Sequence, residues 1–164
     1  MAKTSDDLRF KEWFLAERAR NLAAVVLTRR SDLDFKDVKE DTGLDYLVHI
    51  VHDHRPTGKS FVILLRGAMS PVTEGHANKV LRPTVASFGG LGPFYYPVCL
   101  FFFTMRDDQG YYTWLLEPVI TEQGSPKLIR RTDPDCRKLD DDALDHIVST
   151  VSAWYDALPG DAAG

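Results

Sequence analysis

The sequence predicts an α/β fold, in which one mixed β-sheet is flanked by an N-terminal and a C-terminal helix. Three observations lead to this prediction: the length of the chain, its ordinary composition, and the order of its periodic segments. A chain of 164 residues has the size of one domain and buries enough surface to fold without a disulfide or a metal. Helical periodicity at both ends encloses strand-like segments, which is typical of a sheet packed between helices. We expect residues 1–158 to form this single domain and residues 159–164 to form a frayed tail.

Composition narrows the class of protein. The formal net charge is −4, from 20 Lys and Arg against 24 Asp and Glu, so the chain lacks the overall positive charge typical of nucleic-acid-binding proteins. The first residues contain no apolar core of a secretory signal. The most apolar run is about nine residues long, whereas a membrane-spanning helix needs roughly twenty. Two cysteines without CxxC spacing give no sign of a disulfide or a zinc site. We expect a cytoplasmic protein without membrane partners.

The first predicted element is a helix over residues 5–29. Thr4 and Asp7 have capping-box spacing, and the segment contains neither Pro nor Gly. Two apolar stripes run along this segment at helical spacing. The first stripe comprises Leu8, Leu15, Ala19, Leu22 and Val26, and the second comprises Phe10, Trp13 and Phe14. Two stripes indicate either a helix that is buried on two sides or a break near Asn21, with residues 22–28 as a strand.

Strand-like segments come next along the chain. They are residues 33–38, 44–52, 61–66, 97–105, 111–116 and 127–131. Residues 44–52 are apolar at both alternating sets of positions, which predicts a strand that is covered on both faces. Pro56 and Gly58 predict a turn over residues 54–59, so that the second and third segments form a hairpin. The apolar run of residues 97–105 predicts a central, fully buried strand.

Two further helices complete the prediction. Residues 79–88 form a short helix with Pro83 in its first turn. The closing helix begins at a cap formed by Asp140 or Asp141 and ends before Pro159. Its apolar stripe comprises Leu144, Ile147, Val148, Val151, Trp154, Tyr155 and Leu158.

The predicted hairpin carries the residues that could support chemistry. Asp45 stands at the start of its first strand, and Leu64 and Arg66 share a face of the second strand, which can be the face that bears Asp45. A helix with Glu17 precedes both strands. Carboxylates on a helix and a strand can hold Mg²⁺, whose bound water attacks a phosphodiester while a nearby cation neutralises the phosphate. Such parts are those of restriction-type nucleases.

Short segments that contain these residues resemble a known bacterial family. The segments are residues 16–18, 41–50, 57–67 and 96–100. They resemble domain-of-unknown-function family 4365, a branch of the PD-(D/E)XK nuclease superfamily, and the resemblance extends over roughly residues 12–118. It implies a restriction-endonuclease-like fold with a four-stranded mixed sheet. It also implies a Mg²⁺ or Mn²⁺ site at Glu17, Asp45 and the Leu64/Arg66 pair.

The chain departs from the family at the second strand. The family carries Gln or Glu, any residue, and then Lys, but this chain has Leu64, Leu65 and Arg66. Leucine offers no oxygen to a cation, and arginine is not equivalent to lysine at a tight site. We therefore expect a vestigial catalytic site of Glu17, Asp45 and Arg66, with Asp45 and Glu17 as the remaining metal ligands and no resident cofactor.

Simpler roles remain open for the same residues. Glu17 can pair with Arg20 or Asn21 one turn along the helix. Asp45 can cap a turn at the start of its strand, and Arg66 can be a solvated cation at a strand end.

The sequence supports three functional hypotheses. The leading one is a catalytically decayed nuclease-like domain that binds nucleic acid or a partner protein, and the family suggests a mobile-element or defence context. The second is an active Mg²⁺- or Mn²⁺-dependent deoxyribonuclease with a ligand recruited from Glu40, Asp41 or Glu74. The third is a homodimeric structural protein. Its candidate contact residues are the aromatic side chains of residues 94–96, or Tyr111 and Tyr112 with Trp114.

Overall fold

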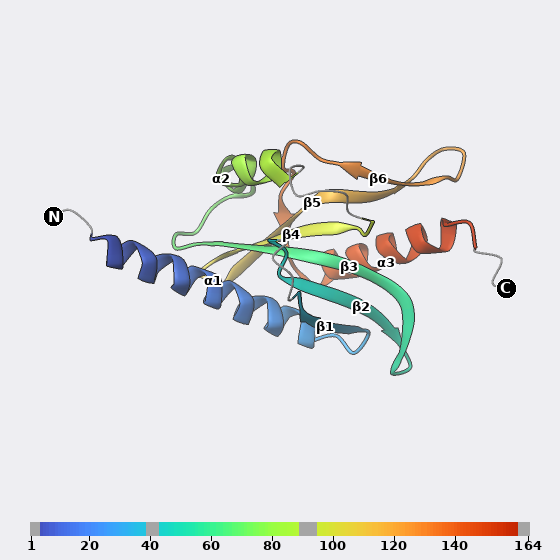
Figure 1. Cartoon of the computed structure of the whole chain (residues 1–164), viewed down its shortest axis with the longest axis horizontal. Helices are drawn as coiled ribbons and strands as arrows, with labels where there is room; N and C mark the ends of the chain where they lie inside the picture. Colours follow the sequence, from blue (N-terminus) through green and yellow to red (C-terminus); the bar gives the residue numbers. More distant parts are fainter. Residues whose placement is uncertain (1–3, 39–42, 89–94, 161–164) are drawn as a thin grey trace.

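A seven-stranded mixed sheet between helices forms the protein (Figure 1). The computed structural model describes residues 4–38, 43–88 and 95–160. Its elements are α1 (Ser5–Thr28), β1 (Leu33–Asp37), β2 (Tyr46–His52), β3 (Arg55–Ala68), α2 (Glu74–Ser87), β4 (Val98–Thr104), β5 (Gln109–Ile120), β6 (Pro126–Arg130), β7 (Arg137–Lys138) and α3 (Asp141–Ala157). The predicted fold class, an α/β fold with one mixed sheet and helices at both ends, is confirmed for these residues.

The strands follow the order β1-β2-β3-β4-β5-β6, and β7 pairs with β5 outside this path. The β3–β4 pair is parallel, and the other described pairs are antiparallel. The strands that pair in antiparallel fashion are neighbours in sequence, apart from β7, whereas α2 lies in the connection between β3 and β4. The sheet is therefore wider than the four strands that the family resemblance implies.

The central strand β4 is buried along its whole length, as predicted. Cys99, Phe101 and Phe103 pack beneath α1 and α3, whereas Leu100 and Phe102 pack beneath α2 on the opposite face. Because successive side chains of a strand point to opposite faces, an uninterrupted apolar strand requires helices on both sides. The apolar run therefore determines the three-layer arrangement.

Helix α1 begins at the predicted capping box, in which the Thr4 hydroxyl accepts from the Asp7 amide. It runs without interruption to Thr28, so the predicted break near Asn21 and the strand over residues 22–28 are both wrong. The first apolar stripe faces the sheet from Leu15 onward. The second stripe is exposed, so α1 is not buried on two sides.

Gly67 allows α1 to lie close to β3. A Cβ atom at this position would stand 2.6 Å from Cε of Met105 and 3.4 Å from the carbonyl oxygen of Leu15 in α1. A larger residue would therefore push the helix or Met105 away from the strand. This close approach brings the middle of α1 over the beginning of β2 and the end of β3.

The β2–β3 hairpin turns at Asp53 and His54, earlier than the predicted turn over residues 54–59. Both residues have positive φ, 49° and 62°, as a two-residue hairpin turn of the favoured hand requires. Pro56 and Gly58, which prompted the wrong prediction, lie within β3 at an irregularity of the pairing. There the Thr57 hydroxyl donates to the Ile50 carbonyl at 2.6 Å.

The two later helices differ in how well their predicted starts agree with the structure. Helix α2 begins at Glu74 under a Thr73 cap, so Pro83 lies inside the helix and not in its first turn. Helix α3 begins as predicted, with the Asp140 carboxylate accepting from the Ala143 amide at 2.8 Å. No helix in the described part of the chain has both the length and the apolar character needed to span a bilayer.

Both cysteines are buried, and we predict that they are unreactive in the folded protein. Burial raises the pKa of Cys136 to about 12 and raises that of Cys99 well above its ordinary value. Because the thiolate is the reactive form, a thiol reagent such as dithionitrobenzoate should react slowly at pH about 8 until denaturant unfolds the chain. Rapid release of two equivalents of chromophore from the native protein would contradict this placement.

Candidate functional site

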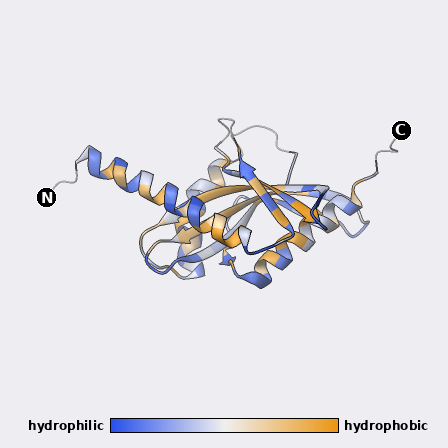
Figure 2. Ribbon diagram, turned by 90° about the horizontal axis from the view of Figure 1, so that it is seen from below, coloured by the Kyte–Doolittle hydropathy of each residue, from blue (hydrophilic) through white to orange (hydrophobic). Residues whose placement is uncertain are grey.

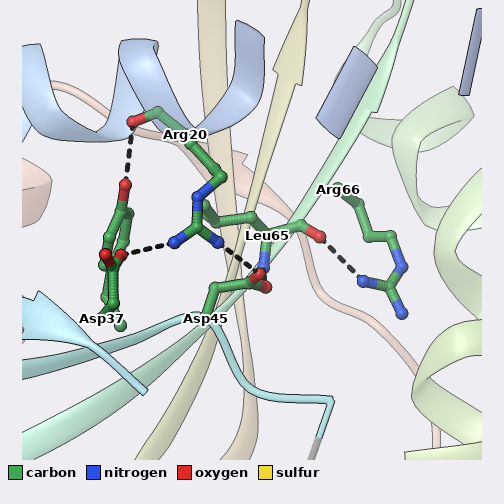
Figure 3. A network of polar contacts seen from close by, with 6 residues as sticks. Arg20, Asp37, Asp45, Leu65 and Arg66 are labelled. Carbon is green, nitrogen blue, oxygen red and sulfur yellow. Dashed lines mark hydrogen bonds and ion pairs between the residues drawn. The ribbon is translucent and has the colours of Figure 1, made fainter. Parts of the chain in front are cut away.

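Asp45 directly precedes β2, at the edge of the region in which β2 pairs with β3. Its amide donates to the Ile63 carbonyl at 2.9 Å, directly beside the last paired residues of the two strands, Tyr46 and Ile63. Beyond Ile63, β3 has no residue of β2 beside it, and the amide of Leu65 points to this open side of the strand. The Asp45 carboxylate accepts from this amide at 2.7 Å (Figure 3). The side chain thus replaces a strand residue as the hydrogen-bond partner of β3.

Arg20 of α1 holds the other oxygen of Asp45. One guanidinium nitrogen donates to Asp45 Oδ1 at 3.1 Å, and a second contacts Asp37 at the end of β1. The guanidinium also lies 4.9 Å from the centre of the Tyr46 ring, and the Tyr46 hydroxyl donates to the Arg20 carbonyl at 3.4 Å. One arginine therefore connects α1 to β1 and to the start of β2 (Figure 3).

Arg66 lies beside the same backbone segment. Its guanidinium donates to the Leu65 carbonyl at 2.8 Å, so Asp45 and Arg66 contact the N–H and the C=O of one residue. Arg66 is otherwise exposed and forms no ion pair with any residue that the structure describes. Its positive charge still acts on Asp45 and opposes the rise that burial causes in the pKa of Asp45.

Glu17 and Leu64 make no hydrogen bond or ion pair with Asp45. Glu17 is exposed and forms no hydrogen bond or ion pair within the described ranges, but its charge acts on Tyr46, whose pKa burial raises and Glu17 helps to raise. Leu64 is 2% exposed and belongs to the apolar cluster beneath α2. The sequence allows Asp45 to share the face of Leu64, but in the structure the Asp45 carboxylate accepts from a backbone amide of β3 and from Arg20 of α1.

The other ligand candidates that the structure describes form no metal centre. Glu74 opens α2 and is exposed, and Glu40 and Asp41 lie outside the described residues. Among the residues that the structure describes, no three His, Cys, Asp or Glu side chains lie together in a way that could hold a metal ion.

The aromatic residues suggested for a dimer contact differ in exposure. Tyr111, Tyr112 and Trp114 are 7–8% exposed, so they are core residues, and this part of the homodimer hypothesis is wrong. Tyr95 and Tyr96 are exposed, and Phe94 lies outside the described residues.

Burial dominates the electrostatics of Asp45. It raises the pKa of this carboxyl above its ordinary value, while the Leu65 amide and the charges of Arg20 and Arg66 oppose the rise. The side chain is 24% exposed. An acid in this position accepts hydrogen bonds from fixed donors, and its negative charge is already balanced by a tethered cation.

Sequence reasoning missed Arg20 and Asp37. The only sequence signal for Arg20 is its place next to Ala19, at the border of the stripe that faces the sheet. A charged residue at such a border can reach the end of a strand, but the sequence does not show which strand end lies within its reach.

A cleft away from Asp45 lies between β5, β7 and the start of α3. This cleft has a volume of about 830 Å³. Its walls carry five acids and three bases that are Arg or Lys, and two of the bases are in ion pairs, Arg131 with Glu117 and Arg137 with Asp135. Acids therefore outnumber these bases in the cleft.

No family model, no curated protein and no solved structure matches the chain significantly. The resemblance to a nuclease branch therefore rests on the short sequence segments that contain Glu17, Asp45 and Arg66. The local geometry of the site provides the independent argument about function.

We predict that Arg20 contributes to stability and that Glu17 does not. Replacing Arg20 by Met leaves the half-buried Asp45 carboxylate without its cation, and we expect the free energy of unfolding to fall by about 1–2 kcal/mol. Glu17→Gln, one turn away on the same helix, should change it by less than about 0.5 kcal/mol. Urea denaturation of both variants measures the difference. Equal losses would show that Glu17 does belong to the cluster.

The raised pKa of Asp45 predicts a specific pH dependence. Because the folded pKa lies above the unfolded one, ionisation of Asp45 costs stability, which is lost as the pH rises through the folded pKa. The unfolding free energy of the wild type minus that of Asp45→Asn should therefore fall as the pH rises across this window and then stay constant. Carbon NMR of the Asp45 carboxyl should show the raised pKa directly, and Arg20→Met should raise it further. A carboxyl pKa below the ordinary value would contradict the dominance of burial.

Proposed function

We propose that this protein is a catalytically inactive, nuclease-like domain that works as an interaction module. The observation that carries the proposal is the engagement of both oxygens of Asp45 by donors of the chain itself. Mg²⁺ prefers oxygen ligands in near-octahedral geometry and usually takes one or two carboxylates. To bind such an ion, Asp45 would have to use its remaining lone pairs beside the guanidinium of Arg20, whose positive charge repels a cation.

The neighbouring positions support the same conclusion. The position at which the related family carries an oxygen ligand is occupied here by Leu64, which is buried among apolar side chains. Glu17 is turned to solvent, and Arg20 of the same helix contacts Asp45 in its place. The helix thus supplies a positive charge where a metal site needs a negative one.

The distribution of charge favours a protein partner over nucleic acid. Six of the twelve described arginines are in ion pairs with acids of the chain. The pairs are Arg18–Asp108, Arg20–Asp37, Arg20–Asp45, Arg30–Asp32, Arg30–Asp145, Arg82–Asp133, Arg131–Glu117 and Arg137–Asp135. Phosphate binding depends on cations that are free to replace counterions. With half of the described arginines paired and a net charge of −4, the chain has fewer free cations to offer nucleic acid, which favours a protein partner.

We predict that the protein neither binds Mn²⁺ nor cleaves DNA. Calorimetric titration with Mn²⁺ should give no heat above dilution, and plasmid or single-stranded DNA should stay intact in Mg²⁺ or Mn²⁺. Asp45→Ala serves as the matched control. If heat or cleavage is present in the wild type and absent from this variant, the domain is an active nuclease and the proposal fails.

A gel-shift assay tests the choice of partner. We expect no retardation of DNA at physiological salt, for the wild type and for Arg66→Ala alike. Retardation that Arg66→Ala abolishes would assign the site to nucleic-acid binding.

A further inference from the structure

The first turns of α1 form a helical arm that extends beyond the sheet. Every residue from 5 to 14 is exposed, and Leu15 is the first residue of α1 that packs against the core cluster. Figures 1 and 2 both show the N-terminal end of α1 projecting past the strands. We call residues 5–14 the α1 arm. Because the arm continues a long, packed helix, it needs no separate nucleation.

One face of the α1 arm is aromatic. Phe10, Trp13 and Phe14 have the helical spacing of three and four residues, so they share one side. They are 66%, 60% and 37% exposed, and the Phe10 and Trp13 rings lie 6.1 Å apart. This is the second apolar stripe of the sequence. It faces away from the sheet, because the stripe that begins at Leu15 faces the core.

The amount of apolar surface fits a protein interface. At about 150–250 Å² per aromatic side chain, the exposed fractions leave roughly 350 Å² of apolar area on this face. One side of a standard interface covers about 800 Å², of which about 56–65% is apolar. Three aromatic residues therefore supply most of the apolar area that one partner of a stable dimer needs.

We propose that the aromatic face of the α1 arm is the contact between two copies of this chain. The inference rests on the proposed interaction role and names the partner. In a two-fold dimer the same surface meets itself, so a helical arm with one apolar face pairs naturally with its own copy in an antiparallel arrangement. The domains then lie at opposite ends of the pair of arms.

The antiparallel alignment brings both opposite and like charges together. When Phe10 of one copy lies opposite Phe14 of the other, Asp6 lies opposite Arg18, and symmetry repeats both contacts. Arg18 contacts Asp108 at 2.8 Å within its own chain and remains 42% exposed. The same alignment places Asp7 near Glu17, and this like-charge contact offsets the attraction between Asp6 and Arg18. The apolar area of the aromatic face therefore carries the preference for a second copy.

The arm is a poor match for an anionic membrane. Its acids Asp6, Asp7 and Glu12 outnumber its bases Arg9 and Lys11, whereas helices that bind anionic lipid surfaces are rich in Lys and Arg. Lipid is therefore an alternative occupant that the experiment must separate from a second copy.

Sedimentation equilibrium from low to high micromolar concentration tests the proposal. We expect the wild type to dimerise, and the double variant Phe10→Ser with Trp13→Ser to weaken association at least tenfold. Ile129→Ser, which removes an exposed apolar residue from β6, is the matched control and should leave the dimer unchanged. Circular dichroism verifies that each variant is folded.

Trp13 provides a second measurement. Trp114 and Trp154 are 8% and 6% exposed, so the emission of Trp13 should shift to the blue as concentration rises. Trp13→Phe should retain the dimer and lose this shift.

Three outcomes would overturn the proposal: a wild type that stays monomeric, a dimer that the double variant does not weaken, or an arm that binds anionic vesicles as a monomer. None of them depends on metal binding or DNA cleavage. A failed dimer and a failed inactive-domain proposal are therefore distinguishable.

Discussion

The carboxylate of Asp45 accepts the hydrogen bond of a β3 amide at the point where the pairing of β2 with β3 ends. An unpaired backbone amide in a partly buried position costs about 1–3 kcal/mol, and Asp45 removes this cost at Leu65. Arg20 balances the negative charge of the Asp45 carboxylate. Through its ion pair with Asp37, Arg20 also connects β1 to α1. A metal ion at Asp45 would have to compete with the Arg20 guanidinium for this carboxylate. The role of Asp45 in the fold and the proposed lack of a metal site therefore depend on the same contact.

Much of the fold could be predicted from local patterns. Thr4 and Asp140 mark the beginnings of α1 and α3 because a cap is a short-range interaction that the sequence displays directly. The apolar run around Phe101 indicates a doubly covered strand for a similarly direct reason. The predicted hairpin turn is misplaced because Asp53 and His54 adopt positive φ, a conformation usually associated with glycine, while Gly58 lies within the strand.

The candidate site was predictable only in part, because its partners meet through tertiary structure. The place of Asp45 at a strand start is visible in the sequence, but Glu17 and Arg20 lie one turn apart on the same helix. The rotation of α1 about its axis decides which of the two reaches the strand end. That rotation results from the burial of Ala19, Ala23 and Leu27, which directs Arg20 toward Asp45 and Glu17 toward solvent. The same rotation directs Phe10 and Trp13 outward, and the sequence could not distinguish this from burial on a second side.

The parallel pairing of β3 and β4 divides the sheet into two halves, each built from antiparallel pairs. On either side of this seam, consecutive strands pair in antiparallel fashion across short connections, and such contacts form early because little chain entropy is lost. Pairing Val62 with Val98 requires the chain to close a loop that contains all of α2. From this topology we expect docking of the two halves along the seam to be the slowest step of folding. Until it occurs, β3 and β4 each expose an open edge, which makes the half-folded chain most prone to aggregation at this stage.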